Sequence, residues 1–230
     1  MSGLKLTNLS YSVDGTELLH DISFTQASVG ISAILGPNGA GKSLLLSLIH
    51  GVIKPNMGRV TWDGILADKT KLSRGFVFQT PIVLRRSVRA NLAYPLKING
   101  QHSETAIKAM LELSHLTPLA KQPAASLSGG EAQRMAIARA LITKPEVLLL
   151  DEPCSNLDPA STKLIEAMIG QFVAKGGSVF ISTHDLAQAK RLADTVLFIN
   201  AGQLLEHTAA RDFFDGPETP QAQAYLNGDL

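Results

Sequence analysis

One glycine-rich segment constrains the fold of this chain more than any other part of its sequence. Residues 36–43 read Gly-Pro-Asn-Gly-Ala-Gly-Lys-Ser, which matches the pattern G-x-x-x-x-G-K-[ST]. The apolar run 31–35 before this segment predicts a buried strand, and the apolar density of 42–53 after it predicts a helix. In the order strand, loop, helix, such a segment wraps a phosphate with its backbone N–H groups. The sequence therefore predicts an α/β protein that binds a nucleoside triphosphate.

The residue types of this loop assign a role to each part of it. The predicted nucleotide-binding residues are Gly36, Pro37, Asn38, Gly39, Ala40, Gly41, Lys42, Ser43 and Leu44. We expect the amides of 39–44 to hold the β-phosphate at the positive end of the following helix. Lys42 is expected to pair with the β- and γ-phosphates, and Ser43 to ligate Mg²⁺. A glycine turn with a surface lysine is the alternative, and the flanking strand and helix argue against it.

An acidic pair follows a second apolar run. Residues 147–150 read Val-Leu-Leu-Leu, and Asp151 and Glu152 come next. A strand that is apolar at every position fits a parallel sheet covered on both faces, and α/β proteins place their ligands at the carboxyl ends of such strands. We expect Asp151 to hold Mg²⁺ and Glu152 to polarise an attacking water. Without the phosphate loop, the pair could equally be a helix cap or a solvated turn.

A second glycine-rich helix start lies in the middle of the chain. Ser128, Gly129, Gly130 and Glu131 follow Leu127 and open an alanine-rich helix. Alone, this pattern is typical of a simple N-cap, with serine at the start and glycines in the turn. Beside a phosphate loop, it indicates a second anion site at a helix terminus.

The remaining pattern alternates between strands and helices, with one helical interruption. The expected strands cover residues 5–13, 21–26, 31–35, 59–62, 75–78, 147–151, 178–183 and 195–200. The expected helices cover residues 42–53, 87–98, 104–114, 130–142, 159–174 and 186–193. Helical signals dominate from 87 to 142, which predicts a helical subdomain inside a mostly parallel α/β core. Only the tail after Gly216, which holds Pro217 and Pro220, is expected to be loosely ordered.

Composition narrows the cell compartment and the partners. Across 230 residues, 21 Lys and Arg stand against 20 Asp and Glu without any basic block, so no nucleic-acid partner is expected. The only cysteine is Cys154, which suits a reducing compartment. The start, residues 1–10, lacks the pattern of a secretion signal, and no stretch has the roughly 18 uninterrupted apolar residues of a spanning helix. We therefore expect a cytoplasmic protein.

Taken in order, these motifs resemble those of ATP-binding cassette (ABC) ATPases from residue 5 to about 203. The resemblance implies a P-loop NTPase fold with a mostly parallel core sheet, an N-terminal antiparallel β subdomain and an inserted helical subdomain. It implies one domain over 1–230: a core of 1–79 and 144–216 that includes the β subdomain, a helical subdomain of 80–143, and a tail of 217–230. Leu44 departs from the hydroxyl residue that usually stands there, and Glu131 replaces a commoner glutamine.

The resemblance also gives roles to isolated residues. Gln79 matches the glutamine that contacts Mg²⁺ and water and links the core to the helical subdomain. His184 matches the histidine that contacts the γ-phosphate, and Asp158 matches the aspartate that meets the opposite protomer. Tyr11 matches the aromatic residue that stacks on adenine. The stretch from Ser128 to Glu131 matches the signature that faces the ATP of a second protomer, so the resemblance implies a homodimer that sandwiches two ATP molecules with Mg²⁺.

The resemblance further implies a transport role. Because the chain has no spanning segment, a separate integral-membrane permease is expected, with an extracytoplasmic solute-binding protein as an indirect partner and a location on the inner face of the plasma membrane. The stretches 41–46 and 78–88 are similar to those of tungstate, molybdate and phosphate-type importer ATPases, with tungstate the first choice of cargo. The alternatives are another solute, a soluble non-transport ABC ATPase, or a P-loop kinase, which would leave Asp158 and His184 without a role.

Overall fold

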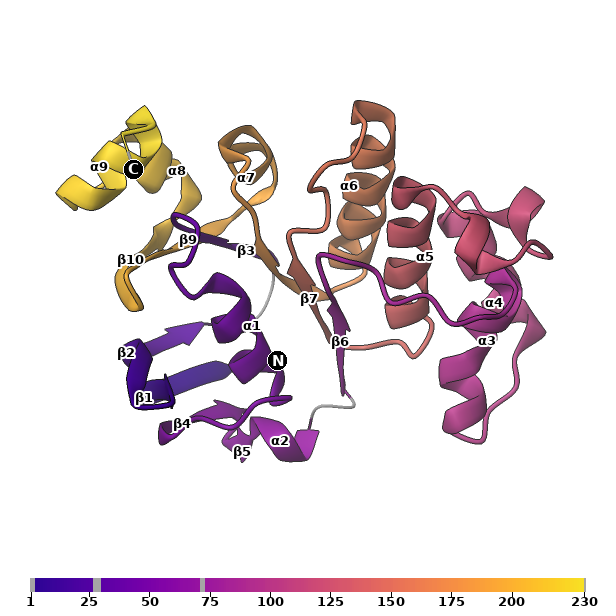
Figure 1. The fold of residues 1–230 in the computed structure, drawn as a ribbon, viewed down its shortest axis with the longest axis horizontal. Coiled ribbons are helices and arrows are strands. Elements are labelled where there is room, and N and C mark those ends of the chain that lie inside the picture. The colour runs from indigo at the N-terminus through magenta and orange to yellow at the C-terminus, as the bar shows by residue number, and fades with distance from the viewer. Residues whose placement is uncertain (1–2, 27–29, 71–72, 230) are drawn as a thin grey trace.

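The structure is a computed structural model that describes residues 3–229 except 27–29 and 71–72. Met1 and Ser2, where the alternating segment 1–10 begins, and Leu230 at the end of the tail lie outside the described residues. Figure 1 shows strands on one side of the molecule and a group of helices on the other. Among the described residues, no helix combines the length and the apolar composition needed to cross a bilayer.

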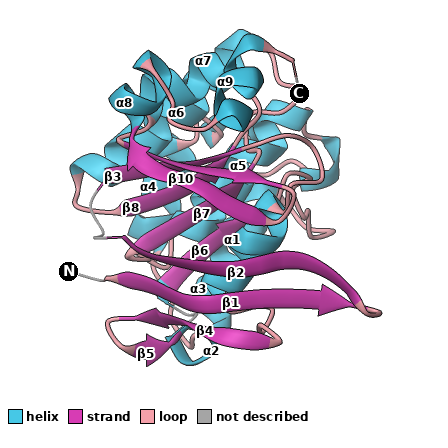
Figure 2. Cartoon of the chain, turned by 90° about the vertical axis from the view of Figure 1, so that its left-hand side faces the viewer, coloured by secondary structure: helices cyan, strands magenta, loops and turns pink. Residues whose placement is uncertain are grey.

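The strands form two sheets, as expected (Figure 2). The antiparallel sheet has the order β2-β1-β4-β5, and the larger sheet has the order β10-β9-β3-β8-β7-β6. In the larger sheet, neighbours from β9 to β6 pair in parallel, and β10 joins antiparallel at one edge. The strands are β1 (Leu4–Val13), β2 (Thr16–Gln26), β3 (Gly30–Leu35), β4 (Met57–Trp62), β5 (Ile65–Leu66), β6 (Arg74–Val77), β7 (Val147–Asp151), β8 (Ser178–Ser182), β9 (Thr195–Asn200) and β10 (Gln203–Ala209).

Helices cover both faces of the larger sheet. They are α1 (Lys42–His50), α2 (Ala67–Thr70), α3 (Val88–Ile98), α4 (Glu104–Leu113), α5 (Gly129–Leu141), α6 (Pro159–Ala174), α7 (Leu186–Leu192), α8 (Ala210–Asp215) and α9 (Pro220–Asn227). Two 3₁₀ turns, η2 (Thr117–Leu119) and η3 (Ala124–Ser126), lie between α4 and α5. Serine hydroxyls at 87, 103 and 128 cap α3, α4 and α5, which explains where these helices begin.

The fully apolar central strand divides its side chains between two cores. Leu148 and Leu150 pack in one core with the helical subdomain and α6, whereas Val147 and Leu149 pack in the other with α1 and the antiparallel sheet. All four are at most 2% exposed. Successive side chains of a strand point to opposite faces, so a strand covered on both sides has to be apolar throughout.

Several predicted bounds were wrong. The second strand begins at Thr16 instead of residue 21, because it pairs with β1 all the way from the turn at Asp14 and Gly15. Helix α1 ends at His50 instead of residue 53, because Gly51 takes a left-handed conformation (φ 89°) and caps the helix. The short elements β5 and α2 and the edge strand β10 were not predicted. The other expected elements agree with the structure within two residues; the domain boundaries stay a prediction.

The prediction of a loosely ordered tail was also wrong. Residues after Gly216 form α9, whose first turn is capped by the Thr219 hydroxyl. Buried Glu206 of β10 accepts hydrogen bonds from the Thr219 amide at 2.7 Å and from its hydroxyl at 2.6 Å. The Tyr225 ring packs on Phe198 with centroids 5.3 Å apart. The two prolines mark the entry to this helix, since proline is tolerated in a first turn.

Removing residues 217–230 should lower the free energy of unfolding by about 2–4 kcal/mol, because Phe198 and its neighbours lose their apolar cover. The substitution Gln221→Ala, at an exposed position of the same helix, is the matched control and should have little effect. Urea unfolding measures both. Equal stability of the shortened and the full chain would show that α9 contributes nothing to the core.

Candidate functional site

Many of the predicted site residues gather at the carboxyl ends of the parallel strands. The glycine loop follows β3, Asp151 ends β7 and Glu152 follows it, and His184 comes shortly after β8. Gln79 comes shortly after β6, the neighbour of β7. Residues from four separate parts of the sequence therefore meet at one edge of the sheet, the place where α/β folds bind ligands.

The loop needs glycine at specific points. Gly36, Gly39 and Gly41 have φ values of 148°, 79° and 103°, in the region that side chains disfavour. A Cβ on Gly36 would also lie 1.9 Å from the carbonyl oxygen of Ile199, a backbone atom that has no room to move. Position 36 therefore requires glycine for two reasons: its positive φ and the close approach of the Ile199 backbone.

Helix α1 presents its N-terminus toward this loop. Gly41 is its N-cap and supplies no side-chain acceptor to the first turn. A hollow of about 290 Å³ is lined by Leu18, residues 38–44 and Glu152. Uncapped amides at a helix start form an anion site. Leu18 was missed by the sequence reasoning, because a leucine in a strand carries no signal of its own.

Lys42 is held inside the loop. Its side chain is 6% exposed, and its Nζ donates to the carbonyl oxygens of Gly36 at 2.7 Å and Pro37 at 3.0 Å. Burial lowers the pKa of the Lys42 ammonium, while the carboxylates of Glu152 and Asp151 raise it in part. The ammonium therefore lies between the loop and the acidic pair, where a phosphate would give it a stronger partner.

Asp151 joins three segments. Its Oδ1 accepts hydrogen bonds from the Ser43 hydroxyl at 2.8 Å and from the Ser182 hydroxyl at 2.6 Å. Ser182 also accepts from the Glu152 amide, through its Oγ at 3.0 Å. Ser182 was not predicted; a serine that ends an apolar strand just before His184 was the signal that could have revealed it. Ser43 and Asp151, 108 positions apart, are thus in direct contact.

One carboxylate oxygen of Glu152 contacts both Gln79 and His184. Its Oε2 lies 3.0 Å from Nε2 of Gln79 and 3.1 Å from Nδ1 of His184. A carboxylate can only accept, so the Nδ1 of His184 carries the proton. Glu152 itself has φ 42°, an unusual conformation for a residue with a side chain. Such strain is typical of functional positions.

The donor set suits magnesium. The Ser43 hydroxyl, the Asp151 carboxylate and the Gln79 amide oxygen are hard oxygen ligands. Magnesium keeps several waters and is usually bound by one or two carboxylates together with substrate phosphates. The contact between Ser43 and Asp151 places two of these donors side by side.

The second glycine-rich start is a capping box. The Ser128 hydroxyl accepts from the Glu131 amide at 3.4 Å, and the Glu131 carboxylate accepts from the Ser128 amide at 2.8 Å. The Ser128 amide and the Ser128 hydroxyl, which both donate to this carboxylate at 2.8 Å, lower the pKa of Glu131. None of the described hydrogen bonds joins 128–131 to the loop, and Figure 1 shows α5 among the helices on the side away from α1. The structure does not bring this start into the chain's own site.

The two glycines of this start differ in their surroundings. A Cβ on Gly130 would lie 2.3 Å from Oγ and 2.7 Å from Cβ of Ser161 on α6. A Cβ on exposed Gly129 would meet only Leu157, at 3.7 Å. Packing within the chain therefore requires Gly130 but leaves Gly129 unexplained.

Asp158 and Tyr11 lie outside the cluster around Glu152. Asp158 caps α6, and its Oδ1 accepts from the amides of Ala160 and Ser161, both at 2.9 Å. Hydrogen bonds from Ser161 lower the pKa of this carboxyl. Tyr11 is half-buried in β1 opposite Leu19, which would touch a Cβ on Gly41. Tyr11 is therefore one strand away from the loop.

A family model, curated relatives and a solved structure all resemble this chain over most of its length or its central part. A family model described as "ABC transporter" matches residues 19–155. The phosphate import ATP-binding protein PstB 2 of Natronomonas pharaonis is 34% identical over an alignment 248 positions long, which covers 99% of this chain and 87% of that protein. The tungstate uptake system ATP-binding protein TupC of Peptoclostridium acidaminophilum is 39% identical over 207 residues, covering 88% and 97%. The structure of cbiO1 from Clostridium perfringens, described as part of the ABC transporter complex cbiONQ, superposes with a TM-score of 0.82 at 29% identity, covering 99% and 95%.

Ser182→Ala should lower the free energy of unfolding by about 1–3 kcal/mol, because it removes a fully buried donor to the Asp151 carboxylate. Urea unfolding measures the change, and Ser126→Ala, at an exposed serine, is the matched control. If both variants unfold like the original chain, the Ser182 hydroxyl does not support Asp151.

Proposed function

The chain belongs to the ABC transporter family, and from this premise we propose that it is the ATP-hydrolysing subunit of an importer, acting as a homodimer with a separate permease. It is an ATPase, as the family match and the ATP-binding relatives support. The observation that carries the proposal is the convergence of Gln79 and His184 on one oxygen of Glu152, next to the contact between Asp151 and Ser43.

The reaction follows from these contacts. The loop amides and Lys42 would hold the β- and γ-phosphates of ATP. Ser43, Asp151 and Gln79 would hold Mg²⁺, which neutralises charge that develops on the transferred phosphoryl group. Glu152 would accept a hydrogen bond from the attacking water and orient it toward the γ-phosphate. His184, already bonded to Glu152 through Nδ1, has Nε2 left to donate to a phosphate oxygen in its protonated form.

Dimerisation would complete the site. The N-terminus of the 13-residue helix α5 carries Ser128, Gly129, Gly130 and Glu131. None of the described hydrogen bonds joins these residues to the phosphate loop of the same chain. A helix start of this kind binds anions, so it would face the γ-phosphate held by the partner. The exposed Gly129 fits this role, because a missing side chain lets another surface come close to the backbone. Asp158 would meet the same partner.

A groove beside Gln79 fits the permease. It has a volume of about 390 Å³ and lies where β6 meets α3 and α5. Its lining includes three exposed apolar side chains: Phe78 (43% exposed), Ile82 (55%) and Ile98 (64%). Large exposed apolar side chains in a groove are typical of a protein interface. The adjacent Gln79 would transmit closure of the ATP site to the bound permease, on the inner face of the plasma membrane.

The cargo is proposed to be an oxyanion, with tungstate first. The support is that one relative is named for phosphate import and another for tungstate uptake. An indirect partner would be an extracytoplasmic solute-binding protein. Expression of this chain with the permease and binding protein encoded beside it, followed by uptake of tungstate, phosphate and methionine, tests the choice. Uptake of methionine alone would contradict an oxyanion cargo.

Glu152→Gln should still bind ATP and dimerise but hydrolyse it at least about 100-fold more slowly, because the amide cannot polarise water as a carboxylate does. Phosphate release measures turnover, and size-exclusion chromatography with ATP and Mg²⁺ measures dimerisation. Glu112→Gln, at an exposed position of α4, is the control. Undiminished turnover, or a monomer in ATP, would remove Glu152 from the proposed role.

Replacing each signature glycine by alanine separates packing from catalysis. Gly130→Ala should lower the free energy of unfolding by about 1–3 kcal/mol because of its clash with Ser161. Gly129→Ala should unfold like the original chain but lose at least about tenfold in ATPase turnover, because the partner's ATP no longer fits against the helix start. Thermal unfolding and turnover are measured on both. Normal turnover of Gly129→Ala would mean that no partner ATP approaches this position.

A further inference from the structure

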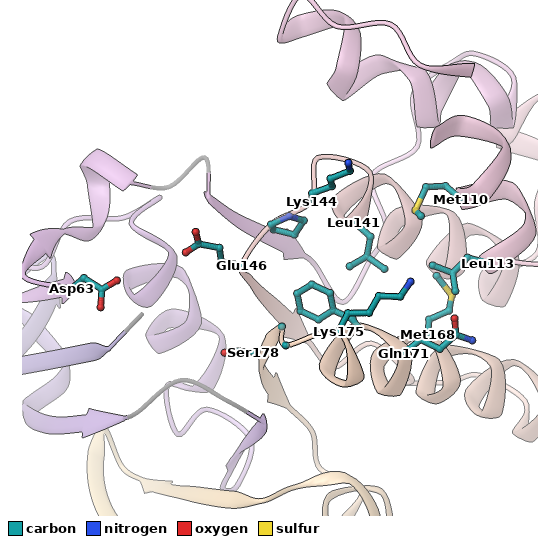
Figure 3. Close-up of a pocket in the computed structure, with 14 residues that line it drawn as sticks. Asp63, Met110, Leu113, Leu141, Lys144, Glu146, Met168, Gln171, Lys175 and Ser178 are labelled. Atoms are coloured by element: carbon teal, nitrogen blue, oxygen red, sulfur yellow. The ribbon is translucent and has the colours of Figure 1, made fainter. Parts of the chain in front are cut away.

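A second cavity lies at the end of the sheet opposite the ATP site. It has a volume of about 720 Å³ and opens beside Pro145 and Ser178, where β7 and β8 begin (Figure 3). Helices α4, α5 and α6 supply its methionine, leucine and phenylalanine side chains. A volume of this size falls in the range of about 300–1,000 Å³ that is usual for small-molecule sites. None of the residues assigned to ATP binding or hydrolysis lines it.

The floor and one wall of this cavity are apolar. Met110 and Leu113 come from α4, Leu141 comes from α5, and Met168 and Phe172 come from α6. Leu141 and Met168 are buried in the core, whereas Met110, Leu113 and Phe172 are half-buried. Methionine side chains are flexible and polarisable, so this wall can fit apolar groups of different shapes.

Two lysines are among the residues that line the cavity. Lys144 and Lys175 are exposed, and neither ammonium has a hydrogen-bond or ion-pair partner among the residues that the structure describes. Figure 3 shows the Lys175 side chain reaching across the cavity toward Leu113 and Met168, whereas the Lys144 side chain points away from this wall and Asp63 and Glu146 lie on the far side. The positive charge next to the apolar wall is therefore that of Lys175.

We propose that this cavity binds a small amphipathic anion, with an apolar body against the methionines, Leu113 and Phe172 and a single carboxylate-type head on Lys175. Octanoate is a probe of this class, and 1-octanol is its uncharged counterpart. The chain's own ATP carries several charges and a large polar sugar, for which this apolar wall has no complement. The site is independent of the proposed transport function.

Isothermal titration calorimetry with octanoate on the full chain tests the charge. The original chain should bind one octanoate, and Lys175→Gln should bind it about two- to fivefold more weakly, as expected for one exposed ionic contact. The same variant should bind 1-octanol as the original does, since the alcohol has no charge. The variant Lys121→Gln, which loses one exposed lysine elsewhere, is the matched control.

A plugged variant tests the location. Gln171 lines the cavity from the exposed face of α6, so Gln171→Trp should fill the cavity without disturbing the core and abolish octanoate binding. Gln101→Trp, at another exposed glutamine, should leave binding intact. No saturable octanoate binding to the original chain, equal affinity of the Lys175→Gln variant, or binding that survives Gln171→Trp would each overturn the proposal. Failure of ATP hydrolysis would leave it untouched.

Discussion

The contact between Ser43, Asp151 and Ser182 is the constraint on which the site depends. One carboxylate oxygen ties the start of α1, the end of β7 and the end of β8 together. With Asp151 fixed, the next residue is held in a left-handed conformation that aims Glu152 at Gln79 and His184. The acidic half of the proposed ATP site therefore depends on hydrogen bonds to a single buried aspartate, and hydrogen bonds to a charged acceptor are the strong ones.

The two cores explain how this edge of the sheet is kept rigid. The parallel strands are covered by α1 and the antiparallel sheet on one face and by the helical subdomain and α6 on the other. Catalytic groups on strand ends are positioned more precisely than groups on free loops. Helix α5 belongs to the same packing, because Gly130 lets it approach α6 at Ser161. The same packing fixes the position of its exposed start at Gly129, the position that the proposed dimer would use.

The two ends of the sheet have different chemistry. The carboxyl ends of the strands collect backbone amides, carboxylates and Lys42, a polar set that suits phosphates and magnesium. The amino ends of β7 and β8 open on methionine, leucine and phenylalanine side chains, with two lysines at the rim. Leu141, near the end of α5, lines the apolar cavity, so a ligand there would touch the far end of the helix that Ser128 caps.

The sequence by itself determined the α/β class, the phosphate loop and the acidic pair, because these depend on local order: an apolar run, then glycines or carboxylates at its end. Only the tertiary structure decided that Ser182 supports Asp151, that Glu152 holds Gln79 and His184 on one oxygen, and that Gly130 is needed against Ser161. It also decided that the tail is a helix packed on Phe198. Leucines such as Leu18 and a proline-containing tail give no local signal, since their roles come from neighbours that are distant in the chain.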